Sequence, residues 1–296
     1  MDEKKRKMRR ITRTTKSPVS PPEQRAEDLM DRITPVSELQ TPEIVVAYGR
    51  SGTGKTTFAA TFPKPILILD AKEDGTDSIM DEKDIHVLQV DKWEDIELVY
   101  WGLKLGKIVS PDSGQPFKTV VWDTITHISD LAVLEVKARD GKDPEASMSQ
   151  RLWGDLSGLM KQWIGNYKAL AKEVGINVVF LAQERVENAG DGDEVDELEE
   201  SQLDPSVGPQ VTPAVQKELC ASAKIIIYTF IKEVIKRKKG KIVRKNEYYA
   251  RVGPHPYYIT KVRKPKKVKA PDSIKDPSYE KLMQIKRGEF KDGEEA

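Results

Sequence analysis

A short segment near residue 50 combines glycines, a lysine and hydroxyl side chains at a spacing that suits phosphate binding. Gly49-Arg50-Ser51-Gly52-Thr53-Gly54-Lys55-Thr56 matches the pattern G-x-x-x-x-G-K-[ST] at every position. The glycines permit backbone angles that point several N–H groups inward, where they can donate to phosphate oxygens. Lys55 would reach the β- and γ-phosphates, the Thr56 hydroxyl would ligate Mg²⁺, and Thr57 would follow at the same helix start. The segment therefore predicts a nucleoside triphosphate site.

The residues on either side of this motif agree with that interpretation. Ile44 to Tyr48 form a short apolar run, typical of a buried parallel strand, and residues 55–62 suit a helix that Pro63 ends. The motif would then join a strand to a helix, whose N-terminus adds the positive end of its dipole. The alternative is a glycine-rich turn followed by an ordinary helical lysine.

A carboxylate at the end of a second strand usually helps to hold the Mg²⁺ of such a site. Asp123 follows the apolar run Thr119 to Trp122 and is the first candidate. Asp70 follows the run Ile66 to Leu69, lies closer to the motif in sequence, and is the competing candidate. We favour Asp123, together with Thr56, as the metal-binding pair.

Strand-like and helix-like segments alternate along most of the chain. Fully apolar strands that alternate with amphipathic helices argue for an α/β fold with a mostly parallel, doubly wound sheet. Beyond Lys224 the pattern changes to strands joined by a basic turn and a Gly-Pro-His-Pro loop, which suggests an antiparallel extension at the sheet edge. The expected strands are 44–48, 66–69, 85–90, 119–122, 177–181, 224–236, 242–251 and 257–262, and the expected helices are 55–62, 93–105, 128–138 and 149–173.

Charge is balanced over the whole chain but not along it. The 296 residues carry 49 Lys and Arg against 48 Asp and Glu, so the net charge of +1 does not indicate a partner. The basic N-terminal residues and the Ser/Pro stretch behind them predict a disordered arm and linker over 1–40. We expect a core domain over 41–271 and a polar C-terminal extension over 272–296.

The cysteine content and the apolar runs exclude several classes of protein. Cys220 is the single cysteine, so it forms neither an intramolecular disulfide nor a Cys-rich zinc site, and it fits a reducing compartment. No apolar run approaches the roughly 20 residues of a membrane span. No apolar segment follows the basic N-terminus as it would in a secretory signal. We expect a cytoplasmic protein with no membrane partner.

The order of the candidate residues resembles the ATPase core of RecA-like P-loop proteins. The motif is followed by Leu69-Asp70-Ala71-Lys72-Glu73, then by Val121-Trp122-Asp123-Thr124, then by Val178-Val179-Phe180-Leu181-Ala182-Gln183. Over about residues 41–271 the chain looks most like the short phage-encoded RecA-like ATPases (AAA-type nucleotide-binding proteins) that accompany or perform single-strand annealing. The resemblance implies a RecA-like P-loop NTPase fold, ATP and Mg²⁺ as cofactors, and the cytoplasm of a host cell.

The resemblance also implies roles for single residues. Glu73 would polarise the attacking water, although the usual Asp-x-Glu spacing is longer by one residue here, so a neighbour could be the base. Gln183 would sense the γ-phosphate and pass that signal to the loop that follows. Lys261, Arg263 and Lys264 would reach the ATP of the next subunit, or else form an ordinary solvated strand end. Shared ATP sites imply a homo-oligomer, either a ring or a filament.

Single-stranded DNA is the partner that the resemblance implies, but one segment opposes it. Residues 191–204 carry eight acids and no base, in a loop that would face DNA, whereas phosphate binding needs Lys and Arg. Basic residues lie instead in 1–16, 232–245 and 261–269, with tyrosines near them that could stack on bases. An ordinary edge strand has a similar composition, so both interpretations stay open. A single-strand-binding protein or another recombination protein is a further candidate partner.

Three functions compete on these grounds. The first is an ATP-hydrolysing recombination protein that acts on single-stranded DNA. The second is an NTP-dependent adaptor that loads a helicase or a nuclease. The third is a small-molecule kinase, which would need an Arg-rich lid that is not visible between residues 124 and 176. Stimulation of ATP turnover by DNA separates the first function from the others.

Overall fold

The computed structural model describes residues 29–30, 33–35, 41–72, 75–187, 206–238 and 241–291, without the side chains of 236–238 and 241–243. The chain divides into a unit up to Gln40 and a second unit from Thr41 onward. The second unit contains every element from β1 to α7. Most of the predicted arm over 1–40 and the whole acidic segment 191–204 lie outside the described residues.

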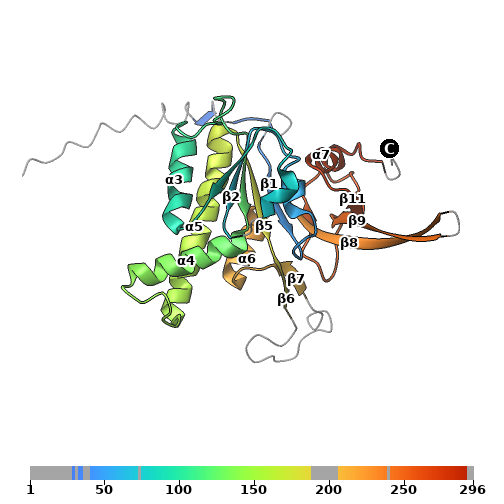
Figure 1. The fold of residues 1–296 in the computed structure, drawn as a ribbon. Coiled ribbons are helices and arrows are strands. Elements are labelled where there is room, and N and C mark those ends of the chain that lie inside the picture. Colours follow the sequence, from blue (N-terminus) through green and yellow to red (C-terminus); the bar gives the residue numbers. More distant parts are fainter. Residues whose placement is uncertain are drawn as a thin grey trace, which may run out of the picture. The chain divides into compact units, whose positions relative to one another are not determined.

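Parallel strands form the centre of the sheet (Figure 1). Four of them, β1, β2, β4 and β5, are buried along their whole length, which explains their continuous apolar sequences. Their spatial order is β8-β1-β5-β4-β2-β3, so β5 lies between β1 and β4. The bounds are β1 Ile44–Tyr48, β2 Ile66–Asp70, β3 Ile85–Gln89, β4 Thr119–Asp123, β5 Asn177–Ala182 and β8 Ile225–Lys238.

Helices cover both faces of this sheet (Figure 1). Successive side chains of a strand point to opposite faces, so Val46 of β1 packs in one core cluster and Val45 in the other. On one face lie α3 (Trp93–Lys104), α4 (Ile125–Arg139), α5 (Gln150–Val174) and α6 (Pro213–Ser222). On the other lie α2 (Lys55–Ala59), the 3₁₀ helix η2 (Gly75–Ile79) and α7 (Tyr279–Arg287). The predicted α/β, doubly wound fold class is confirmed.

Antiparallel strands extend the sheet beyond β8, as the change of pattern after Lys224 predicts. β9 (Lys241–Arg251) pairs with β8 from Tyr228↔Arg251 to Lys238↔Lys241, and β11 (Ser273–Lys275) pairs with β9. The predicted strand 257–262 is reduced to β10 (Lys261–Val262), which pairs with β8. The short strands β6 (Glu184–Glu187) and β7 (Ser206–Pro209) form a separate pair that the sequence did not indicate.

The C-terminal residues differ from the expected polar extension over 272–296. β11 joins the sheet, and α7 packs on it through fully buried Leu282 and Ile285, together with Ile274 of β11. These apolar positions are few and stand among Lys, Glu and Arg, so the segment is polar on average although one side of it belongs to the core. The domain therefore continues past the predicted boundary at residue 271.

Candidate nucleotide-binding site

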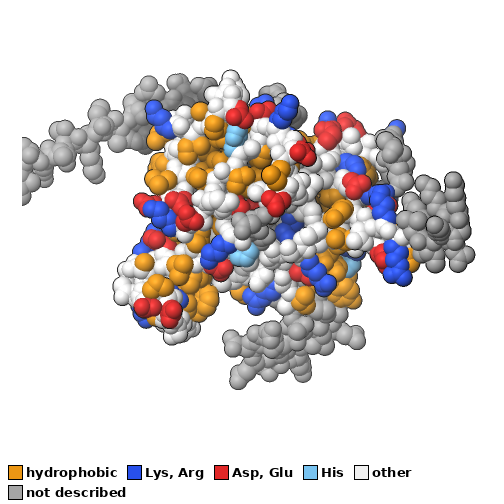
Figure 2. Space-filling model, viewed as in Figure 1, with side chains coloured by type: hydrophobic (Ala, Val, Ile, Leu, Met, Phe, Trp, Pro, Cys, Tyr) orange, Lys and Arg blue, Asp and Glu red, His pale blue; other side chains and the backbone are white. Residues whose placement is uncertain are grey.

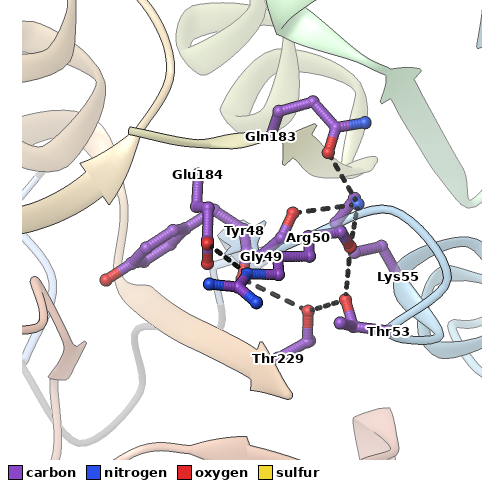
Figure 3. Close-up of polar contacts among 8 residues, drawn as sticks. All are labelled: Tyr48, Gly49, Arg50, Thr53, Lys55, Gln183, Glu184 and Thr229. Carbon is purple, nitrogen blue, oxygen red and sulfur yellow. Dashed lines mark hydrogen bonds and ion pairs between the residues drawn. The ribbon is translucent and has the colours of Figure 1, made fainter. Parts of the chain in front are cut away.

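The glycine-rich motif forms the loop between β1 and α2, at the carboxyl end of β1. Gly49 lies against β8, where an added Cβ would meet the Thr229 carbonyl oxygen at 2.3 Å. Thr53 fastens the loop to the same strand, because its Oγ1 lies 2.7 Å from Oγ1 of Thr229 (Figure 3). Gly54 caps α2 with a left-handed φ of 83°, a conformation that favours glycine. Each of these constraints explains a residue type of the motif.

Lys55 is buried inside the loop, with its ammonium group turned toward the loop backbone. Nζ donates to the carbonyl oxygens of Gly49 at 3.1 Å and Arg50 at 2.9 Å, and to Oε1 of Gln183 at 3.4 Å (Figure 3). Gln183 follows β5, and its backbone N–H donates to Oγ1 of Thr126 at 3.1 Å. The structure thus brings together Lys55 and Gln183, which were predicted from segments far apart in the sequence.

Thr56 contacts the carboxylate that ends β4. Its hydroxyl donates to Oδ2 of Asp123 at 2.8 Å, and Asp123 is buried. Asp70 lies beside Asp123 in the register of β2 and β4, but it accepts a hydrogen bond from Nε2 of Gln89. The adjacent hydroxyl and carboxylate are hard oxygen donors, which suit Mg²⁺. Of the two candidate carboxylates, Asp123 is the one that contacts Thr56, whereas Glu73 lies outside the described residues.

A cavity of about 640 Å³ opens in front of the loop. Its walls include the expected residues Ser51 to Thr57 and Asp123. They also include Tyr248 of β9 and the segment Asp276 to Ser278, which sequence reasoning did not assign to the site. No local pattern marks these residues, because pairing of β8, β9 and β11 brings them to the loop.

An ion pair links the loop to the strand pair beyond Gln183. Nε of Arg50 lies 2.8 Å from Oε1 of Glu184, which raises the pKa of Arg50 (Figure 3). Burial, and then a hydrogen bond to Glu184, raise the pKa of the Tyr228 hydroxyl. Glu184 was another residue that the sequence did not single out, although it directly follows Gln183. It connects the phosphate-binding loop to the aromatic side chains of β8.

Of the three cations expected to act on a neighbouring subunit, two lie at the end of α6. Nζ of Lys261 donates to the Cys220 carbonyl at 2.6 Å, and Nη2 of Arg263 donates to the Ala221 carbonyl at 3.1 Å. Lys264 donates to the carbonyl of Val268. Cations suit the carbonyl end of a helix. Burial lowers the pKa of Lys261. These contacts concern one chain, and action on a second subunit stays a prediction.

No group of three or more His, Cys, Asp and Glu side chains is placed to hold a metal ion within the described ranges. Among the helices of the same ranges, none is long and apolar enough to cross a membrane.

A strand that leads through a glycine-rich loop into a helix, with a buried lysine in the loop, is the phosphate-binding arrangement of the P-loop NTPases. The fold and the site assign the chain to this class. Within it, the chain belongs to the family described as the AAA domain, whose model matches residues 41–263. Membership indicates nucleotide binding and hydrolysis as the kind of chemistry. No curated protein is significantly similar to the chain.

Proposed function

We propose that this protein hydrolyses ATP and acts on single-stranded DNA in recombination, by annealing or strand exchange, with assembly coupled to the nucleotide. The proposal also takes the protein to be phage-encoded and to work in the cytoplasm of a host cell. The single observation that carries the DNA part is a row of stacked aromatic rings with cations over it, on the β8–β9 hairpin and the segment that follows β9.

The loop supplies the groups for phosphate binding and hydrolysis. Lys55, whose ammonium group already lies among carbonyl oxygens, is placed to exchange them for phosphate oxygens. Thr56 and Asp123 would hold Mg²⁺, which when bound would neutralise negative charge on the phosphates. Gln183 contacts Lys55 and would therefore respond to what the lysine binds. Glu73 stays the proposed base for the attacking water.

The aromatic row consists of Tyr258, Tyr228, Phe230 and Tyr249. The centroids of Tyr228 and Tyr258 lie 4.3 Å apart, and those of Phe230 and Tyr249 lie 5.8 Å apart, both in stacked geometry. Tyr228 and Phe230 are nearly parallel, with an angle of 12° between their planes. Sequence-independent binding of single strands uses aromatic side chains on which bases stack, beside a basic groove. The row offers such a surface.

Cations lie over this row. Nζ of Lys232 is 4.3 Å from the ring centroid of Tyr249, and Cζ of Arg251 is 5.3 Å from that of Tyr258. Lys232 is exposed and can also meet a phosphate. Neutralising phosphates releases counterions, which is the main source of affinity for nucleic acids. The mixture of rings and cations therefore supports binding of a single strand rather than of a neutral ligand.

An exposed apolar stripe on α3 supports self-assembly into a ring or filament. Leu98, Trp101 and Leu105 lie at helical spacing and are at least half exposed, and apolar side chains gather around α3 on the face shown in Figure 2. Exposed apolar patches often mark protein contacts. The same stripe is what an adaptor would use to dock a helicase, a nuclease or a single-strand-binding protein, and this is the second candidate function.

Steady-state ATP hydrolysis with and without single-stranded DNA tests the proposal. We expect single-stranded DNA to stimulate ATP turnover more than duplex DNA does. We expect Lys55→Ala to abolish the turnover. Slow turnover that DNA does not change would favour the adaptor function. Transfer of phosphate to a small acceptor would identify a kinase instead.

A further inference from the structure

The cavity in front of the phosphate-binding loop is larger than the phosphates alone require. Its volume of about 640 Å³ is in the range of sites that enclose a whole small ligand, about 300–1,000 Å³. From Lys55 it extends past Phe58 to Thr61, beyond the end of α2, and to Ser278 at the start of α7. The cavity is therefore large enough for the sugar and the base of a nucleotide in addition to its phosphates.

Tyr248 of β9 lines this cavity beside the phosphate-binding loop. An added Cβ on Gly54 would lie 3.4 Å from Cδ1 and 3.9 Å from Cε1 of Tyr248, so the ring lies over the start of α2 at ordinary contact distance. The side chain is 42% exposed. Across the described ranges, no other aromatic ring and no cation lies against it. Part of its ring therefore stays open to the cavity.

The position of Tyr248 is fixed by the C-terminal segment. The Asp276 N–H donates to the Tyr248 carbonyl at 2.8 Å, which continues the pairing of β11 with β9. Nζ of Lys281 in α7 donates to the carbonyls of Lys275 and Asp276. The Tyr279 N–H donates to Oγ1 of Thr61, which joins the start of α7 to the end of α2. These bonds join the C-terminal wall of the cavity to β9 and to the end of α2.

We propose that Tyr248 stacks on the base of the bound nucleotide and that Asp276 to Ser278 close the cavity around it. This inference rests on the proposed nucleotide binding and adds the residues that recognise the nucleoside part. The phosphate-binding loop contacts only the phosphates, so affinity for the base must come from another wall of the cavity. A flat, partly exposed ring at the edge of the cavity is suited to that contact.

Binding of ATP and of inorganic tripolyphosphate, each measured by calorimetry with Mg²⁺ and the full chain, tests the proposal. Stacking of one base on an aromatic ring is worth about 1–3 kcal/mol, or roughly 5- to 150-fold in affinity. We expect Tyr248→Ala to lower the affinity for ATP by a factor in this range and to leave the affinity for tripolyphosphate unchanged. Tyr248→Phe, which keeps the ring, should bind ATP nearly as the wild type does.

Two controls separate this inference from the nucleotide site itself. Lys55→Ala should lower the affinity for both ligands. Trp153 is an aromatic residue of similar exposure outside the cavity, and Trp153→Ala should lower neither affinity. The stacking role would be overturned if Tyr248→Ala left the affinity for ATP unchanged, or if it lowered the affinity for tripolyphosphate equally. The assignment of the phosphate-binding loop would stand in either case. A wild-type protein that binds neither ligand would instead overturn the proposed nucleotide binding.

Discussion

Gly49 is restricted to glycine by its neighbour as well as by its positive φ of 158°. A Cβ at this position would meet both the carbonyl oxygen and Oγ1 of Thr229, at 2.3 and 2.5 Å. Thr229 is itself held, because its hydroxyl donates to the Tyr48 carbonyl at 3.2 Å. The close approach of β8 therefore requires a glycine at the first position of the motif, in addition to the requirement that phosphate binding imposes.

We expect Gly49→Ala to destabilise the protein by about 1–3 kcal/mol, the usual effect of overpacking a rigid site. ATP binding should fall as well, because the loop must move away from β8. Thermal unfolding and calorimetry measure the two effects. The matched control is Gly154→Ala in α5, where an added Cβ meets nothing within 4 Å. That variant should gain roughly 0.5–1 kcal/mol, and a similar loss in both variants would contradict the explanation.

Residues of the site were predictable from the sequence where local pattern or strand order defines them. The motif is contiguous, and Asp123 and Gln183 each end an apolar strand, so the carboxyl edge of a parallel sheet brings them near Lys55 and Thr56. Tyr248 carries no such signal. Its place in the cavity depends on antiparallel pairing of β8, β9 and β11, which the sequence indicated only as an edge extension.

At the scale of the elements, the long periodic helix α5 and the apolar strands were predicted well, whereas the helices α6 and α7 were missed. α5 occupies Gln150–Val174 against the expected 149–173, since its apolar stripe continues through many turns. α6 and α7 are short and contribute few core residues, such as Leu219 and Leu282. A pattern of two or three apolar residues is too brief to separate a helix from a polar loop. Only packing against the sheet identifies it.

We expect the C-terminal helix to be essential for stability. Leu282→Ala, which removes a fully buried side chain, should cost about 2–5 kcal/mol. Glu280→Ala on the exposed side of the same helix is the control and should change stability by less than about 0.5 kcal/mol. Urea denaturation of both variants measures this difference. If Leu282→Ala were as stable as the control, α7 would be an appendage, as the polar composition first suggested.

At the scale of the whole molecule, nearly equal numbers of basic and acidic residues leave DNA binding to the local distribution of charge. Along the aromatic row, Lys232 and Arg251 supply cations, whereas Glu247 is paired with Lys275 at 3.2 Å. Affinity for a single strand should therefore depend on a small number of phosphate contacts. A correspondingly shallow salt dependence is expected.

Lys232→Ala should weaken binding of single-stranded DNA and reduce the slope of log affinity against log salt concentration by about 0.7, the contribution of one phosphate contact. Fluorescence anisotropy with a labelled oligonucleotide at several salt concentrations gives the slope. Lys104→Ala on α3, whose Nζ pairs with Glu173 at 2.8 Å, is the matched control and should leave the slope unchanged. Equal slopes in all three proteins would remove the aromatic row from the DNA-binding surface.

Tyr248 and Tyr249 are adjacent in the sequence, yet the pleat of β9 sends one ring to the cavity and the other to the aromatic row. A slip of the β8–β9 pairing by a single residue would exchange them, because side chains of a strand alternate between its faces. The register of this hairpin thus determines which tyrosine would contact the proposed nucleotide and which would contact the proposed single strand. A one-residue insertion or deletion within β9 would therefore disturb both contacts together, even where the altered position touches neither ligand.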